Sequence, residues 1–345
     1  MSIAKQILRP LLIVLLLCLA GEGLYRLLFY QHDREAYTEG MSRLPDKISQ
    51  TGADVLYLGE SSNHTYGLDD EDTAWISEMI ARELPDMVVL DMTHDAAHSE
   101  VYYYLLRNIK HNCPIGTVVV TMNLRSFGIG WIASPLETAL QKRLVMLQGG
   151  SALVRRAMLT FKSYDIKSED ERYGQMDEHW ATHPLPGHPS VPQWGDSLNE
   201  ARLAIDSSNL PGTFVRNFAF LIDTATNPRV RDFDRIVQLA KQRGWRLIFN
   251  LLPENMQLTD SLVGTDLCNL MRQNRDILVR HYANMGVTVV DNLESVDDAQ
   301  FRDRDWTTEH YLQEGRRTIA KNVAAAIRQQ KIPKKKTRIS GVSGK

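Results

Sequence analysis

The chain has 345 residues, of which 43% are hydrophobic and 24% charged, and its 40 Lys and Arg nearly balance its 42 Asp and Glu. This length predicts one large domain or two ordinary ones, and the composition excludes a disordered, fibrous or coiled-coil protein. The near-neutral net charge also argues against nucleic-acid binding, because the only dense basic run is the tail from Lys331 to Arg338.

The first thirty residues, 1–30, differ in composition from the rest of the chain. Lys5 and Arg9 precede ten consecutive apolar residues, 11–20, which is the length of a signal peptide. The longer stretch 8–30 is also long enough to cross a bilayer as an uncleaved anchor. Both interpretations predict that everything after this segment is exported to the periplasm or the cell surface.

Beyond a linker at residues 31–53, short apolar runs alternate with stretches of helical periodicity. The runs that predict buried strands are 54–59, 87–90, 116–122, 246–252 and 287–290. The stretches that predict helices are 71–84, 99–109, 233–244, 262–285 and 313–329. Continuous apolar strands that alternate with helices indicate an α/β fold, a three-layer α/β/α sandwich around a five-stranded parallel sheet.

One long segment, 125–231, interrupts this domain of residues 54–330. It contains no strand periodicity, and we expect it to be an insertion over the active edge of the sheet. Within it we expect helices at 136–146 and 151–162, followed by a polar stretch at 163–197. The basic tail at 331–345 is predicted to be disordered.

Polar residues gather where the predicted strands end, which is where open parallel sheets bind their ligands. The first, second and third strands are followed by the segments GESSNH (59–64), DMTHDAAH (91–98) and NLRS (123–126), and the segment DRDWTTEHYL (303–312) precedes the last helix.

These four segments resemble the blocks of the SGNH (GDSL-like) hydrolase superfamily, whose sandwich has a flavodoxin-like sheet. In that family a GDS turn supplies a serine nucleophile, a Gly and an Asn supply oxyanion donors, and a DxxH segment supplies a base. The resemblance implies that Ser61 is the nucleophile and His310 the base, and that the Ala96 backbone and the Asn123 side chain hold the oxyanion. It implies no cofactor and no metal.

The acid that orients the base is less directly indicated, because the residue three positions before His310, where the DxxH segment has its Asp, is Thr307. We therefore expect Asp305 to orient His310, with Asp303 and Glu309 as substitutes. A serine hydroxyl is a poor nucleophile until a base takes its proton, so a histidine at a strand-end loop is the partner that this chemistry requires.

The segment His94-Asp95-Ala96-Ala97-His98 is predicted to line the substrate cleft through His94 and Asp95. An alternative is a zinc site that uses His94 and His98, four residues apart. The sequence also leaves open whether Cys113 and Cys268 pair in an oxidising compartment or remain separate thiols.

Within the superfamily, the layout looks most like the membrane-anchored envelope members, the alginate-type acetylation proteins and the D-alanine transfer protein of teichoic acid loci. By that resemblance the chain would transfer or remove acyl groups, acetyl above all, on an envelope polysaccharide, with a membrane acyl-donor protein as a further partner. The alternative is a catalytically degraded module that binds glycan or an envelope partner.

Overall fold

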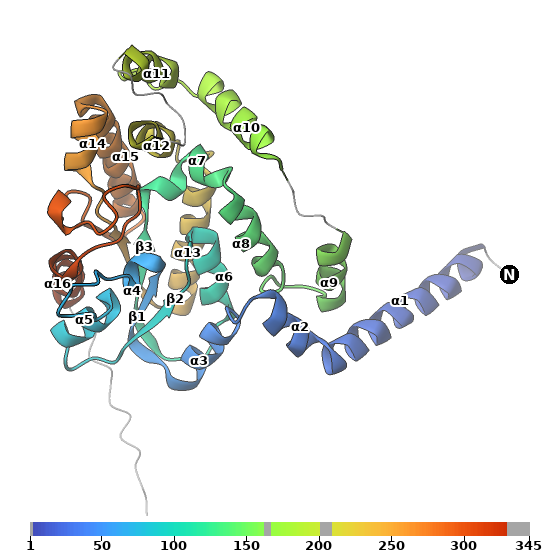
Figure 1. The fold of residues 1–345 in the computed structure, drawn as a ribbon. Helices are drawn as coiled ribbons and strands as arrows, with labels where there is room; N and C mark the ends of the chain where they lie inside the picture. The colour runs from blue at the N-terminus through green and yellow to red at the C-terminus, as the bar shows by residue number, and fades with distance from the viewer. Residues whose placement is uncertain (1–2, 162–166, 201–208, 330–345) are drawn as a thin grey trace, which may run out of the picture.

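The computed structural model describes residues 3–161, 167–200 and 209–329, so the tail at 331–345 lies outside the described residues. Its centre is a five-stranded sheet in the order β2-β1-β3-β4-β5, with every neighbouring pair parallel (Figure 1). The strands are β1 (Ala53–Gly59), β2 (Val89–Thr93), β3 (Ile115–Met122), β4 (Arg246–Leu251) and β5 (Thr288–Asp291). The predicted α/β class with five parallel strands is confirmed.

The order of the strands reverses at the centre of the sheet. From β1 the chain moves to one side for β2 and then returns to the other side for β3, which pairs with β1 directly. Open α/β sheets bind ligands beyond the carboxyl ends of their strands at such a reversal. Ser61 follows β1 and Asn123 follows β3, so both flank this point.

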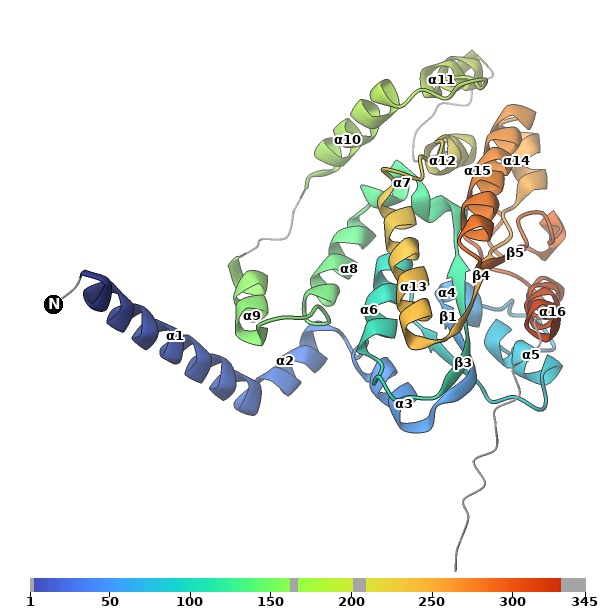
Figure 2. The ribbon, with the colours of Figure 1, turned by 180° about the vertical axis from the view of Figure 1, so that it is seen from behind.

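Apolar side chains pack on both faces of the sheet, because successive residues of a strand point to opposite faces. Along β1, Leu56 and Leu58 join one hydrophobic cluster, and Val55 and Tyr57 join another. The first cluster is covered by α6 (Ser99–Asn108), α13 (Pro228–Arg243) and α15 (Thr265–Asn284), and the second by α5 (Ile76–Glu83) and α16 (Gln313–Gln329). Figures 1 and 2 show α6 and α13 on one side of the strands and α5 and α16 on the other.

The boundaries near the edge strand differ from the prediction. Residues 71–75 form a loop, and α5 begins only at Ile76, where the Glu78 carboxylate accepts a hydrogen bond from the Trp75 N–H and caps the helix. Strand β2 starts later than expected and continues to Thr93, beyond the apolar run. An edge strand tolerates these polar residues because one of its sides pairs with no other strand.

Several stretches without a predicted element are helical. The expected linker contains α2 (Tyr30–Tyr37) and α3 (Arg43–Thr51), and α14 (Met256–Leu262) precedes α15. The insertion contains the two expected helices, α8 (Pro135–Val145) and α9 (Ala152–Phe161). It also contains four helices that were not predicted, α7 (Ile129–Ile132), α10 (Glu169–Thr182), α11 (Val191–Glu200) and α12 (Leu210–Phe218). The short helices are α4 (Ser61–His64), η1 (Leu124–Phe127) and η2 (Asp298–Gln300).

Helix α1 (Ile3–Leu28) projects away from the α/β body (Figure 1). Its segment Ile7–Leu28 has a mean hydropathy of 2.1 and is long and apolar enough to cross a membrane, a test that a signal sequence passes equally. The carboxylate of Glu22 accepts hydrogen bonds from the Ala152 and Leu153 N–H groups at 2.8 and 2.9 Å. This contact fastens α1 to the start of α9.

The two cysteines that follow the first helix do not pair in the structure. Cys113 and Cys268 are both free and buried. The Cys113 thiol donates to the Ile48 carbonyl, and the Cys268 thiol donates to the Met256 carbonyl. Each is therefore a separate core thiol.

A buried ion pair holds the loop after α4 against the last helix. Arg316 of α16 is fully buried, and its Nη1 lies 3.1 Å from Asp70 Oδ2. The same guanidinium donates to the Thr65 carbonyl, while Asp70 accepts from the Gly67 and Gln313 N–H groups. The pair therefore fixes the position of residues 65–72 relative to α16.

We predict that Arg316→Met destabilises the protein by about 3–5 kcal/mol, because it leaves Asp70 buried without its cation. The matched control is Arg317→Met, which removes a half-exposed partner of Glu314 and should cost less than about 1 kcal/mol. Urea unfolding of the full chain in detergent measures both. Equal midpoints for the two variants would contradict the prediction.

Candidate functional site

Ser61 stands at the junction of β1 and α4, at the carboxyl edge of the sheet. The preceding residue, Glu60, is the N-cap of α4, and its carboxylate accepts a hydrogen bond from the Ser62 N–H at 3.2 Å. The first N–H groups of a helix have no partner within the helix. The Ser61 N–H is one of these, so the helix start presents both a hydroxyl and a free amide.

The structure brings Ser61 and His310 together across 249 positions of sequence. Ser61 Oγ lies 2.9 Å from His310 Nε2, and His310 Nδ1 lies 2.5 Å from Asp303 Oδ2. With the proton on Nδ1 directed at Asp303, Nε2 is free to accept the serine proton. A hydroxyl, an imidazole and a carboxylate are thus joined in one hydrogen-bonded chain, the arrangement in which a serine can be activated as a nucleophile.

The carboxylate that contacts His310 is that of Asp303, one of the two expected substitutes, and not that of Asp305. Phe301 and Tyr311 form an antiparallel bridge, and the Arg302 N–H donates to the His310 carbonyl. Asp303 comes directly after this paired end of the loop and therefore lies beside His310. Asp305 lies in the exposed turn of the loop, and no hydrogen bond or ion pair joins it to a residue within the described ranges.

Hydrogen bonds keep the Asp303 carboxylate ionised. Partial burial opposes ionisation, but the Thr308 hydroxyl, which donates to Oδ2 at 2.8 Å, and His310 together outweigh it and lower the pKa of Asp303. An ionised Asp303 stabilises the imidazolium that forms when His310 takes a proton.

The other substitute, Glu309, has a different partner. It is buried and forms a two-pronged ion pair with Arg125, whose Nη2 and Nε lie 2.7 and 3.1 Å from its carboxylate oxygens. Arg125 follows Asn123 on the loop after β3, and its guanidinium lies over the Trp131 ring at 4.8 Å. The ion pair therefore joins the β3 loop to the loop that carries His310.

The two expected oxyanion residues lie in the loops after β2 and β3. Ala96 has a left-handed backbone with φ of 57°, a conformation that glycine adopts freely and that costs other residues about 1–2 kcal/mol. Asn123 caps η1, where its side-chain oxygen accepts from the Ser126 N–H. Neither the Ala96 N–H nor the Asn123 amide nitrogen donates a hydrogen bond within the described part of the chain, so both remain available to a ligand.

The histidines of the second loop have partners of their own. His94 Nδ1 lies 2.8 Å from the Asp95 carbonyl, and Asp95 Oδ1 lies 2.7 Å from His64 Nε2. His98 caps α6, and its Nε2 lies 3.0 Å from Glu137. Burial lowers the pKa of His98 to about 4, so this side chain is neutral at physiological pH. His94 and His98 belong to no cluster of three possible metal ligands among the described residues.

Three buried glutamates lie around the serine, a feature that the sequence interpretation did not include. Glu60, whose Oε2 is 2.9 Å from Ser61 Oγ, is joined by Glu254 and Glu309, with Arg125 as the cation that faces them. Burial raises the pKa of Glu60 and of Glu254, and the nearby Glu309 carboxylate raises both further. Oε1 of Glu60 and Oε1 of Glu254 have no hydrogen-bond partner among the described residues.

The signal for Glu254 was present in the sequence. It follows β4 at the same edge of the sheet as Ser61 and Asn123, in the segment Pro253-Glu254-Asn255. Applying the strand-end rule to the fourth strand identifies it. Its membership in a cluster with Glu60 depends on loop geometry that sequence periodicity does not contain.

The raised pKa of Glu254 gives a pH-dependent prediction. The folded state holds this proton more tightly than the unfolded state, so stability falls as pH rises above the ordinary value of 4.5, by up to about 1.4 kcal/mol per pH unit for one proton. Glu254→Gln removes this loss, and its unfolding temperature should exceed that of the wild type by a margin that grows from pH 4.5 to pH 8. Glu71→Gln, at an exposed position, should show a constant margin. A margin for Glu254→Gln that shrinks with pH would refute the assignment.

Comparison of the sequence with known proteins found no match. No protein-family model matches the chain, and no curated protein matches it in sequence. The site is therefore defined by its own residues: the hydrogen-bonded Ser61, His310 and Asp303 at the carboxyl edge of a parallel sheet.

Proposed function

We propose that the chain is a membrane-tethered, serine-dependent acyltransferase or esterase that acts on acyl groups, acetyl above all, of a cell-envelope polysaccharide. We further propose that it is an SGNH-like protein with a three-layer α/β/α domain. The observation that carries the proposal is the continuous hydrogen-bonded chain from Ser61 through His310 to Asp303. Such a chain is the arrangement that turns a serine into a nucleophile.

The proposed reaction has two steps. Ser61 Oγ attacks the acyl carbonyl while His310 Nε2 takes the hydroxyl proton, and the collapse of the tetrahedral intermediate transfers that proton to the departing alcohol oxygen. Water or a sugar hydroxyl then gives its proton to His310 and attacks the acyl-serine, and the collapse of the second tetrahedral intermediate returns that proton from His310 to Ser61 Oγ as the acyl product leaves. The side chains supply both nucleophile and base, so the reaction requires no cofactor.

Negative charge that develops on the carbonyl oxygen requires donors set in place beforehand. The Ser61 N–H, the Ala96 N–H and the Asn123 side-chain amide are the candidates, since none of them donates within the described residues. The left-handed backbone at Ala96 supports this role, because strained conformations of this kind concentrate at functional sites.

The buried Glu60 affects how well the serine is activated. The hydroxyl has one proton, and Glu60 Oε2 and His310 Nε2 are both 2.9 Å from Ser61 Oγ. An ionised Glu60 would compete with His310 for that proton. The raised pKa of Glu60 favours the neutral acid, which is the weaker acceptor and leaves the proton to His310.

The proposed location is the extracytoplasmic side of a membrane. The apolar, solvent-exposed helix α1 would cross the bilayer once, with Lys5 and Arg9 on the cytoplasmic side. The α/β domain then faces the periplasm or the cell surface, where envelope polysaccharides occur. A membrane protein that delivers the acyl group is the partner that transfer, as opposed to hydrolysis, would require.

The decisive experiment is intact-mass analysis of the full chain in detergent after incubation with a fluorophosphonate. A single adduct that maps to Ser61, and that is absent from Ser61→Ala and His310→Ala, is the expected result. The variants must retain the wild-type unfolding temperature. A folded wild-type protein without an adduct would overturn the proposal and favour a non-catalytic module that binds glycan or an envelope partner.

The assignment of Asp303 is tested by a matched pair of variants. Asp303→Asn should lower kcat/KM for 4-nitrophenyl acetate by about 10³–10⁴-fold, because the amide no longer stabilises the imidazolium or fixes the tautomer. Asp305→Asn alters an exposed turn and should leave the rate close to that of the wild type. If Asp305→Asn causes the larger loss, the hydrogen-bonded chain described above is not the catalytic one.

A further inference from the structure

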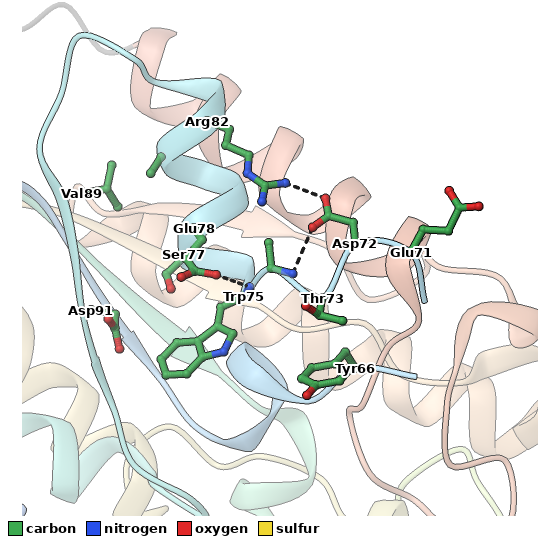
Figure 3. Close-up of a pocket in the computed structure, with 12 residues that line it drawn as sticks. Tyr66, Glu71, Asp72, Thr73, Trp75, Ser77, Glu78, Arg82, Val89 and Asp91 are labelled. Atoms are coloured by element: carbon green, nitrogen blue, oxygen red, sulfur yellow. Dashed lines mark hydrogen bonds and ion pairs between the residues drawn. The ribbon is translucent and has the colours of Figure 1, made fainter. Parts of the chain in front are cut away.

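A hollow of about 660 Å³ lies beside the edge strand β2, next to the helix that carries Ser61 (Figure 3). Its walls are the loop at 66–75, the first turns of α5 and the outer part of β2. The side chains that matter for its chemistry are Tyr66, Asp72, Trp75, Glu78, Arg82 and Asp91. None of these side chains belongs to the proposed catalytic residues Ser61, His310 and Asp303.

Two aromatic rings of this hollow are open to solvent. Tyr66 is 40% exposed and Trp75 is 37% exposed, and Figure 3 shows both rings standing clear of the helix and strand behind them. Large aromatic side chains are usually buried, so a pair of them exposed in one hollow indicates a binding surface. A flat apolar ring with a polar edge suits the face of a sugar ring.

The charge of the hollow restricts which sugars it accepts. Four acidic side chains, Glu71, Asp72, Glu78 and Asp91, line it, and among the described lining residues Arg82 is the one cation. Arg82 Nη1 donates to Asp72 at 2.6 Å, and this hydrogen bond lowers the pKa of Asp72. The remaining carboxyl groups can accept hydrogen bonds from hydroxyl or ammonium groups, whereas they repel carboxylates and sulfates.

A chain of contacts connects the hollow with the catalytic centre. The Trp75 ring lies 5.5 Å from the His64 ring, and His64 is one turn of α4 after Ser61. His64 Nε2 in turn lies 2.7 Å from Asp95, the neighbour of Ala96. A polymer seated on Trp75 therefore reaches the serine and the proposed oxyanion donor within a few sugar residues.

From these observations we infer that the hollow binds a neutral or amino-sugar stretch of the polysaccharide whose acyl group Ser61 handles, and that it rejects uronic-acid polymers. The inference rests on the proposed function and names the substrate class of that site. Trp75 and Tyr66 supply the stacking surface, and the acidic wall supplies discrimination by charge.

The test is calorimetric titration of the full chain in detergent with three hexasaccharides, of glucosamine, of glucose and of galacturonic acid. All titrations use a Ser61→Ala background, so that binding is measured without turnover. The glucosamine and glucose hexamers should bind, and the galacturonic acid hexamer should not. Trp75→Ala should weaken binding of the first two by about tenfold or more. Asp91→Asn should reduce the preference for glucosamine over glucose.

The matched control is Leu68→Ala, a change on the same loop at a residue that is 92% exposed and outside the hollow. It should bind as the parent does. Tyr66→Ala provides a second test of stacking if Trp75→Ala fails to fold. Tight binding of the galacturonic acid hexamer, no binding of any hexamer, or equal affinities for Trp75→Ala and Leu68→Ala would each overturn the inference.

The adduct experiment and the glycan titration distinguish failure of the proposed function from failure of the proposed substrate class. A fluorophosphonate adduct on wild-type Ser61 without Trp75-dependent glycan binding would overturn the substrate class and leave the serine chemistry intact. Trp75-dependent binding without an adduct would support the hollow as a glycan site and overturn the enzymatic proposal.

Discussion

The antiparallel bridge between Phe301 and Tyr311 is the contact on which the site depends. It closes a loop of nine residues between its two ends, and it holds Asp303 and His310 beside each other at the closed side. Tyr311 is itself fixed, since its hydroxyl donates to the Pro253 carbonyl after β4. The bridge thereby holds His310 beside Ser61, although the two residues are 249 positions apart in the sequence.

The second constraint on the site is the excess of buried carboxyl groups over cations near Ser61. The Arg125 guanidinium is close to Glu60, Glu254 and Glu309, and it donates two hydrogen bonds to Glu309. Burial of a carboxylate without its own cation disfavours the ionised form, and the pKa of Glu60 and of Glu254 is raised accordingly. Because Arg125 and Glu309 adjoin Asn123 and His310 along the chain, the same pair also joins the two loops that flank the serine.

The sheet was predictable because its strands are short apolar runs, a pattern that depends only on local sequence. The proximity of Ser61 and His310 was predictable for a related reason, since parallel strands bring their carboxyl ends, and the loops that follow them, to one edge. The choice between Asp303 and Asp305 was not, because it depends on which residues of a loop face each other across a bridge. The insertion was predictable only in part. The helices expected at 136–146 and 151–162 correspond to α8 and α9, whereas α10 was not predicted because it contains many polar residues and little apolar periodicity.

The hydrogen bonds from α9 to Glu22 make the first helix, the candidate membrane span, a structural part of the protein as well. Farther along, Arg156 of α9 binds Asp33 and lies over the Tyr37 ring, so the contact continues onto α2. Removal of residues 1–31 would take away the Glu22 carboxylate that caps α9 and would expose the start of that helix. Loss of the first helix and loosening of the insertion are therefore thermodynamically coupled, and a fragment without residues 1–31 is a different folding unit from the whole chain.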